Sequence, residues 1–88
     1  MKVTFKKSFV KDLRKSRERA LGMRVRELIE SIERASSLQE IPNLRHLKGA
    51  MGYYRIRVGD YRIGLYVKGE TVTLIRFLHR KDIYRHFP

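Results

Sequence analysis

Cysteine is absent from this chain of 88 residues, and so is any long run of apolar residues. Without cysteine, neither a disulfide nor a thiolate metal site can form, so we expect a protein of the cytoplasm. The polar opening of residues 1–6 and the lack of a membrane-length apolar run predict no signal peptide and no membrane span. No internal repeat or low-complexity linker divides the chain. A single domain over residues 1–88 is therefore predicted.

Acidic residues are scarce. The chain has 21 Lys and Arg against nine Asp and Glu, a net charge of +12. The excess is uneven, because residues 1–21 carry eight basic and two acidic groups, whereas residues 22–41 carry three basic and four acidic groups. A field of this sign concentrates polyanions at the surface, so nucleic acid is the leading predicted partner. An anionic membrane surface is a weaker alternative, and an acidic protein partner stays open.

Hydrophobic spacing predicts the order β-α-α-β-β-β. Residues 2–6 alternate like a short strand, Ser8 is placed to cap a first helix, and Gly22 is expected to separate that helix from a second. The second helix has apolar residues at helical spacing, namely Val25, Leu28, Ile29 and Ile32. A loop anchored by Leu44 and Leu47 then leads to the strands. The predicted fold is α+β, a two-helix hairpin packed on one face of a mainly antiparallel four-stranded sheet.

The most informative stretch is residues 53–68, which form two alternating strands joined at Gly59-Asp60, a pair typical of two-residue hairpin turns. This register predicts one apolar face, with Val58 opposite Tyr61, Ile56 opposite Ile63, and Tyr54 opposite Leu65. It predicts a second face with Arg57 opposite Arg62, Arg55 opposite Gly64, and Tyr53 opposite Tyr66. Like charges directly opposite one another destabilise a sheet. A face that gathers three arginines is therefore predicted to hold an anion.

Residues 72–79 are predicted to return as a further strand after a turn at Gly69-Glu70. Pairing Val67 with Val72 places the next alternate residues on the arginine face, namely Thr73, Ile75, Phe77 and His79. The same register places Arg76 on the core face, a misfit that a sheet margin or a bulge would relieve. The tail from residue 80 to residue 88 is expected to be a short helix or irregular.

Four segments together resemble the RelE branch of the RelE/ParE toxin superfamily. They are Ser8-Phe9-Val10-Lys11-Asp12-Leu13, Leu47-Lys48-Gly49, the hairpin from Tyr54 to Ile63, and His79-Arg80-Lys81-Asp82-Ile83-Tyr84. The resemblance covers nearly the whole chain and implies the β-α-α-β-β-β fold. It also implies an mRNA interferase that cleaves messenger RNA in the ribosomal A site without a metal or another cofactor. An acidic antitoxin would neutralise it, and the pair would bind operator DNA to repress its own operon.

RNA cleavage of this kind needs a deprotonated 2′-hydroxyl, a stabilised phosphorane and a protonated leaving oxygen. Arginine suits the second task, because its fork binds two phosphate oxygens and stays charged. The resemblance implies that Arg62 is the first choice there, and that Arg55 and Arg57 stand where several relatives carry lysines. Since arginine is not deprotonated in proteins, the proton carriers would be His79 and Tyr84, with Arg80 as a further phosphate contact. The general base stays open, and catalysis by electrostatic stabilisation alone is an alternative.

Other basic residues and one tyrosine are candidates for contacts with RNA away from the reaction, namely Lys6, Lys7, Lys11, Arg14, Lys15, Lys48 and Tyr53. The basic residues of the first helix could instead form a solvated face of an amphipathic helix. The arginine face could likewise be a set of solvated strand residues. His79 could be a histidine bonded to backbone at the end of the sheet, and Tyr84 could close the core. His46 and His86 form no metal site with His79, because their spacing is irregular and no acidic ligand accompanies them.

Two other function classes stay open. The shared fold would permit a ParE-like inhibitor that binds DNA gyrase and has no RNA chemistry, because fold alone does not determine function. A non-catalytic RNA-binding module could use the same basic face. The arginine face, together with His79 and Tyr84, favours the nuclease.

Overall fold

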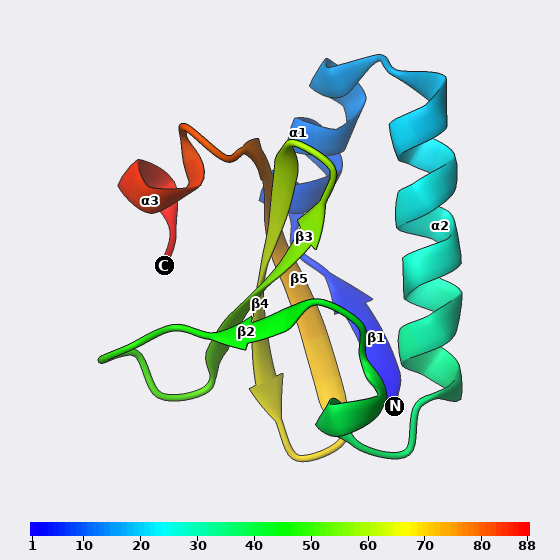
Figure 1. The fold of residues 1–88 in the computed structure, drawn as a ribbon, viewed down its shortest axis with the longest axis vertical. Helices are drawn as coiled ribbons and strands as arrows, with labels where there is room; N and C mark the ends of the chain where they lie inside the picture. Colours follow the sequence, from blue (N-terminus) through cyan, green and yellow to red (C-terminus); the bar gives the residue numbers. More distant parts are fainter.

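The computed structural model describes residues 1–88 and contains one five-stranded sheet. The elements are β1 (Lys2–Phe5), α1 (Lys7–Ser16), α2 (Arg19–Arg34), a 3-10 helix (Leu38–Glu40), β2 (Leu44–His46), β3 (Tyr53–Val58), β4 (Tyr61–Lys68), β5 (Thr71–His79) and α3 (Ile83–His86). The strand order is β1-β5-β4-β3-β2, with β1 parallel to β5 and every other pair antiparallel. Figure 1 shows α1 and α2 on one side of the sheet and α3 on the other. The α+β class and the helical pair are confirmed, whereas the prediction of four strands was wrong.

The additional strand is β2, which lies in the stretch expected to be a loop. It pairs with β3 through Leu44 opposite Ile56 and Arg45 opposite Arg55. Three residues are too short a run to show a period of two, and Pro42-Asn43 before them is typical of a turn. Pairing with β3 makes β2 an edge strand and adds its residues to both faces of the sheet.

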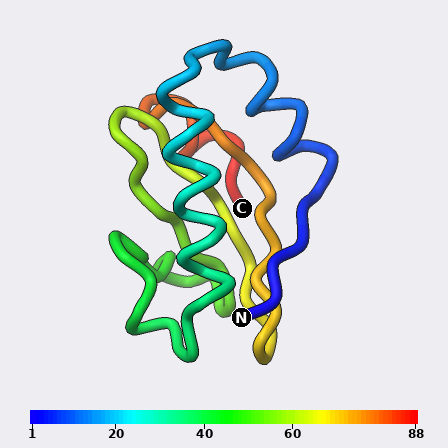
Figure 2. The backbone as a smooth tube through the Cα atoms, turned by 90° about the vertical axis from the view of Figure 1, so that its right-hand side faces the viewer, coloured from blue at the N-terminus to red at the C-terminus, as the bar shows by residue number.

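The core lies between the two long helices and the sheet (Figure 2). Val25 and Ile32 of α2 are 1% and 0% exposed, and they pack in one cluster with Ile63 of β4, also at 0%. Full burial of an aliphatic side chain of this size stabilises the fold by about 1.5–3 kcal/mol. The predicted apolar stripe of the second helix is therefore confirmed. Because this stripe packs against one face of the sheet, the opposite face of the sheet stays open for a functional site.

The helix boundaries differ from two predictions. Ser8 lies inside α1 rather than at its N-cap, and its hydroxyl donates to the carbonyl of Ile75 in β5 at 2.5 Å. Gly22 lies inside α2, and the chain instead turns at Arg17, whose φ is 52°. A single residue in the left-handed region is enough to end a helix, and it need not be glycine. Neither helix boundary could be located from the positions of serine and glycine alone.

The hairpin formed by β3 and β4 has the predicted register at all six pairs. Gly59 takes a positive φ of 59° in the turn, the left-handed region in which glycine has no steric penalty. Arg57 therefore lies opposite Arg62, on the face that points away from α1 and α2, while Ile56 and Ile63 are buried beneath the helices.

The pairing of β4 with β5 is interrupted by a bulge. Leu65 pairs with Leu74, but Gly64 pairs with Arg76, so Ile75 is skipped. One skipped residue reverses the face of every later residue. Phe77 is consequently buried opposite Ile63 on the helical side. The prediction that Phe77 and His79 share the arginine face was wrong, and the bulge resolves the expected misfit of Arg76.

The C-terminal segment covers part of the other face of the sheet. After β5 the chain turns back, and α3 lies on the side of the sheet opposite α2, with Ile83 buried (Figure 1). The ring of Phe87 sits directly over Gly64, where a Cβ atom would come within 2.6 Å of Cγ of that ring. The ring of Phe87 therefore covers this face at Gly64, and the arginines of β3 and β4 lie beside it. None of the helices has both the length and the apolar character needed to cross a membrane.

Candidate functional site

A hollow of about 360 Å³ opens on the face of the sheet that α1 and α2 leave uncovered. We call it the arginine pocket, and its lining residues are Asn43, Arg45, Arg55, Arg57, Arg62 and Tyr84. Four of these six side chains are guanidinium groups, and none is a carboxylate. The pocket is thus a concave, positively charged site without an internal counter-charge.

Three neighbouring strands bring the arginines together. Arg45 of β2 lies directly opposite Arg55 of β3, and Arg57 of β3 lies opposite Arg62 of β4. Each pair of like charges across a rung costs a few tenths to about 1 kcal/mol. The arrangement is therefore unfavourable for the sheet alone and favourable for binding an anion that bridges the strands.

Arg62 is held in place by the turn that precedes it. Its Nη1 atom donates to the carbonyl oxygens of Gly59 at 3.0 Å and Tyr61 at 2.9 Å. These bonds fix one end of the guanidinium and leave Nε and Nη2 without a protein acceptor. A planar group fixed in this way presents two parallel donors, the geometry that matches two oxygens of one phosphate.

Tyr84 enters the pocket from α3 and meets Arg55. The Nη1 atom of Arg55 donates to the hydroxyl oxygen of Tyr84, and its Cζ atom lies 4.8 Å from the centre of the tyrosine ring. Tyr84 as a whole residue is 66% exposed, whereas the preceding residue, Ile83, is buried and fixes the short helix. Tyr84 therefore offers both an open aromatic surface and a hydroxyl group at the edge of the arginine pocket.

Two predicted catalytic residues lie outside this pocket. His79 is on the helical side, with its ring edge-on to Tyr61 at 5.5 Å and its Nδ1 atom accepting the backbone N–H of Lys81 at 3.2 Å. It lines a separate hollow of about 220 Å³ beside Asp12 of α1. The side chain of Arg80 is exposed, and its backbone N–H donates to the carbonyl of Asp60 at 2.7 Å. The bulge in β5 is the reason that His79 does not join the arginines.

The residues predicted to bind RNA fall into several places. Four of them line a hollow of about 640 Å³ at the start of α1, namely Lys6, Lys7, Lys11 and Arg14. Lys15 lines the hollow that contains His79, and Lys48 is exposed in the loop after β2. Tyr53 packs against Tyr66 and Phe87, with ring centres 4.8 and 5.7 Å away. Their role in RNA binding stays a prediction.

One further arginine of the sheet contrasts with those of the pocket. Arg76 of β5 forms an ion pair with Asp12 of α1, its Nε atom 2.7 Å from Oδ2. The hydrogen bond from Arg76 to Asp12 raises the pKa of the guanidinium above its ordinary value, against a smaller opposing effect of burial. No three His, Asp or Glu side chains lie close enough together to hold a metal ion.

The family described as "ParE toxin of type II toxin-antitoxin system, parDE" matches residues 3–84. The chain belongs to the RelE/ParE superfamily of type II toxins. It is similar to Toxin RelE3 of Methanocaldococcus jannaschii, with 46% identity over 89 residues and the whole of both chains covered.

Solved structures agree with this assignment. The toxin resembles a chain of the RelB-RelE antitoxin-toxin complex from Methanococcus jannaschii, with a TM-score of 0.82, 44% identity, and 97% and 99% of the two chains covered. It also resembles a chain of the archaeal RelE-RelB complex from Pyrococcus horikoshii, with a TM-score of 0.73, 26% identity, and 90% and 93% covered. The resemblance stated from the sequence is thereby confirmed.

Two residues of the toxin's arginine pocket were missed by sequence reasoning. Arg45 and Asn43 lie in or just before β2, which was expected to be a loop. In Leu44-Arg45-His46, the side chains of Leu44 and His46 lie on the face of Ile56 and Tyr54, and that of Arg45 lies on the opposite face with Arg55. This alternation is the signal that could have placed Arg45. That pattern becomes informative only when β2 is known to pair with β3.

Proposed function

We propose that this toxin is an endoribonuclease that cleaves messenger RNA in the ribosomal A site without a metal, and that the arginine pocket holds the scissile phosphodiester. The observation that carries the proposal is the convergence of four guanidinium groups on one hollow that contains no carboxylate. A dianionic phosphorane is the species such a site would stabilise best, because its charge exceeds that of the ground state.

The pocket supports a division of roles. Arg62, fixed by two backbone carbonyls, is placed to bind the two non-bridging oxygens as their charge develops. Arg57 lies across the rung from Arg62 and would neutralise the same phosphate from the other side. Arg45 and Arg55 extend the positive surface toward β2, which suits the phosphate of a neighbouring nucleotide.

Proton transfer is assigned to Tyr84. Arginine stays protonated in proteins, and Tyr84 carries the only other acidic or basic group at the pocket. The hydrogen bond that Arg55 donates leaves the phenolic proton free to pass to the leaving 5′-oxygen, while the attacking 2′-hydroxyl gives its proton to solvent water. The exposed ring could also stack on a base, as aromatic side chains do with single-stranded RNA. His79 faces the helices and has no part in this scheme.

The partners proposed for this toxin follow from its charge and its relatives. The net charge of +12 favours both ribosomal RNA and an acidic protein. The solved relatives named above are antitoxin-toxin complexes, so we propose that a cognate acidic antitoxin neutralises this chain in the cytoplasm. Binding of operator DNA by such a pair is part of the same proposal.

The experiment uses purified toxin that has been stripped of metal with EDTA and then desalted, together with a defined messenger RNA on ribosomes kept intact by Mg²⁺. We expect cleavage of the message at the A site, leaving a 2′,3′-cyclic phosphate on the upstream product. Intact message beside an active control interferase would contradict the proposal. DNA breaks that depend on gyrase, with unaltered RNA, would instead establish the ParE-like alternative.

The assignment of the proton carrier is tested separately. We expect the His79→Ala variant to keep most of the cleavage activity and the pH profile of the wild-type toxin, because the side chain lies on the helical side of the sheet. A profile that loses its acidic limb in this variant, the limb that reports protonation of a general base, would return that role to His79.

A further inference from the structure

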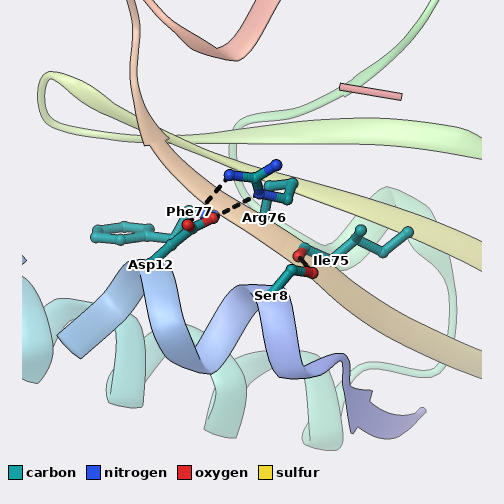
Figure 3. A network of polar contacts seen from close by, with 5 residues as sticks. All are labelled: Ser8, Asp12, Ile75, Arg76 and Phe77. Carbon is teal, nitrogen blue, oxygen red and sulfur yellow. Dashed lines mark hydrogen bonds and ion pairs between the residues drawn. The ribbon is translucent and has the colours of Figure 1, made fainter. Parts of the chain in front are cut away.

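Two side chains of helix α1 form hydrogen bonds with three consecutive residues of β5 (Figure 3). The hydroxyl of Ser8 donates to the carbonyl of Ile75 at 2.5 Å. The carboxylate of Asp12 accepts from Nε and Nη2 of Arg76 at 2.7 and 3.2 Å, and from the backbone N–H of Phe77 at 3.0 Å. Asp12 is the single charged residue among the buried ones. These contacts are made at the bulge of β5 and nowhere else along the strand.

The bulge determines where the chain goes next. Because Ile75 is skipped, Phe77 joins the core and packs edge-on against Phe9, with ring centres 6.3 Å apart. Without the skipped residue, the face of each residue after Leu74 would be reversed, and Arg76 would point into the core. A buried carboxylate that binds Arg76 and the N–H of Phe77 together stabilises the bulged register over the regular one.

The end of β5 in turn places α3. Beyond His79, the N–H of Arg80 donates to the carbonyl of Asp60 at 2.7 Å, and that of Asp82 donates to the carbonyl of His79 at 2.8 Å. The chain then crosses to the other face, where Tyr84 meets Arg55. The position of Tyr84 therefore depends on the direction in which β5 ends.

We propose that Asp12 is a positioning residue of the arginine pocket: by holding the bulge of β5 from the helical side, it sets where α3 crosses the sheet and so places Tyr84 beside Arg55. Its effect on RNA cleavage rests on the proposed function, whereas its effect on α3 does not. The side chain of Arg76 is 27% exposed and that of Asp12 is 7% exposed. A neutral amide at position 12 would leave Arg76 without its counter-charge, so the carboxylate itself is required.

The first experiment compares hydrogen exchange in the Asp12→Asn variant with that in the full wild-type chain. The amide keeps the size of the side chain and an oxygen for the N–H of Phe77. We expect exchange at the backbone amides of Asp82 and Arg85 to accelerate about tenfold relative to the amides of β3 and β4, because local opening is separable from global unfolding. Equal acceleration at all these amides would overturn the proposal, since it would show a merely structural role.

A matched control removes a different contact of the same strand. Thr73→Val deletes the hydrogen bond of 2.8 Å between the hydroxyls of Thr4 and Thr73, which lies before the bulge. We expect this variant to leave the ratio of α3 exchange to β3–β4 exchange unchanged. The same selective acceleration of α3 in Thr73→Val would overturn the proposal. If Asp12→Asn does not fold, Arg76→Lys replaces it as the test, because lysine keeps the positive charge and loses the two parallel donors of the guanidinium group. We expect hydrogen exchange in α3 to accelerate selectively in this variant as well.

The second experiment measures RNA cleavage under single-turnover conditions. We expect Asp12→Asn to lower the maximal rate about tenfold with little change in the apparent affinity for ribosomes, and to cause no further loss in a Tyr84→Phe background. An equal loss in both backgrounds would show that Asp12 does not act through Tyr84. If the wild-type toxin cleaves no RNA, the proposed function fails by itself, and the exchange experiment still decides whether Asp12 places α3.

Discussion

Arg76 and the arginines of the pocket belong to the same sheet, yet only Arg76 has a carboxylate partner. Asp12 neutralises Arg76 from α1 and also binds the backbone beside it. In the pocket, Arg57 and Arg62 face each other across a rung with no acidic side chain among the lining residues. The charge of Arg76 is therefore neutralised within the protein, whereas the charges of the pocket arginines are not.

This difference separates two uses of the same residue type. An arginine that is paired and half-buried contributes to the fold, and its removal leaves an uncompensated partner. Arginines that repel one another across a sheet weaken it, so their presence together indicates an external anion. The comparison therefore predicts opposite outcomes for the two sites: loss of activity with retained folding at the pocket, and loss of stability at Asp12.

The largest expected effect is on cleavage in the Arg62→Ala variant. Removing a fixed donor to the developing phosphorane is expected to lower the cleavage rate roughly 100- to 1000-fold, and to abolish growth arrest on expression, with folding retained by circular dichroism. Arg26→Ala is the matched control, because it removes an exposed arginine of α2, on the other side of the sheet from the pocket. Full activity of Arg62→Ala, or an equal loss in Arg26→Ala, would show that the pocket is not the catalytic site.

The next effect is on stability in the Asp12→Ala variant. This change leaves Arg76 and the N–H of Phe77 without their acceptor, and we expect the free energy of unfolding to fall by about 2–3 kcal/mol. For a domain of this size the melting temperature should fall by roughly 10–20 °C. Asp60→Ala, at an exposed turn, is the control and should stay within about 0.5 kcal/mol of the wild type. Urea unfolding of both variants measures the difference.

The register of the β3–β4 hairpin could be predicted because its information is local. Alternation over residues 53–68 sets the faces, and a two-residue turn at Gly59 sets the pairing. The three arginines of the hairpin were therefore placed on the correct face. Tyr84 could also be named, because the terminal segment carries the family resemblance, although its contact with Arg55 could not be derived from spacing.

The remaining parts of the site depend on contacts that are distant in the sequence. The bulge at Ile75 is held by Asp12, 64 residues before Arg76. The misfit of Arg76 in the regular register indicated a bulge or a sheet margin, but the alternation of β5 could not decide between the two. For that reason His79 was placed on the wrong face. Arg45 was missed because β2 becomes a strand only through its pairing with β3.

Binding of inorganic phosphate tests, with a smaller expected effect, whether the unpaired arginines of the pocket form an anion site. At about ten times its dissociation constant, an anion that binds only the folded toxin should raise the free energy of unfolding by about 1.4 kcal/mol. We expect the Arg62→Ala variant to lose most of this gain, because Arg62 presents its fixed pair of donors in the pocket. Lys7→Ala, in the basic hollow at the start of α1, should keep it. Thermal unfolding with chloride at matched ionic strength separates binding from screening, and loss of the gain in Lys7→Ala alone would place the anion at the other hollow.

The smallest expected effect concerns the repulsion itself. Arg57→Gln removes one of two like charges that face each other across a rung, and we expect it to raise the free energy of unfolding by about 0.2–1 kcal/mol. Lys68→Gln is the control, since Lys68 is an exposed residue of β4 whose cross-strand partner is the uncharged Thr71. In saturating phosphate the order should reverse, with the wild type more stable than Arg57→Gln, because the anion replaces repulsion by attraction at this rung. Equal stability of both proteins with and without phosphate would mean that solvent already screens the pair, and that unpaired arginines on this sheet do not by themselves indicate an anion site.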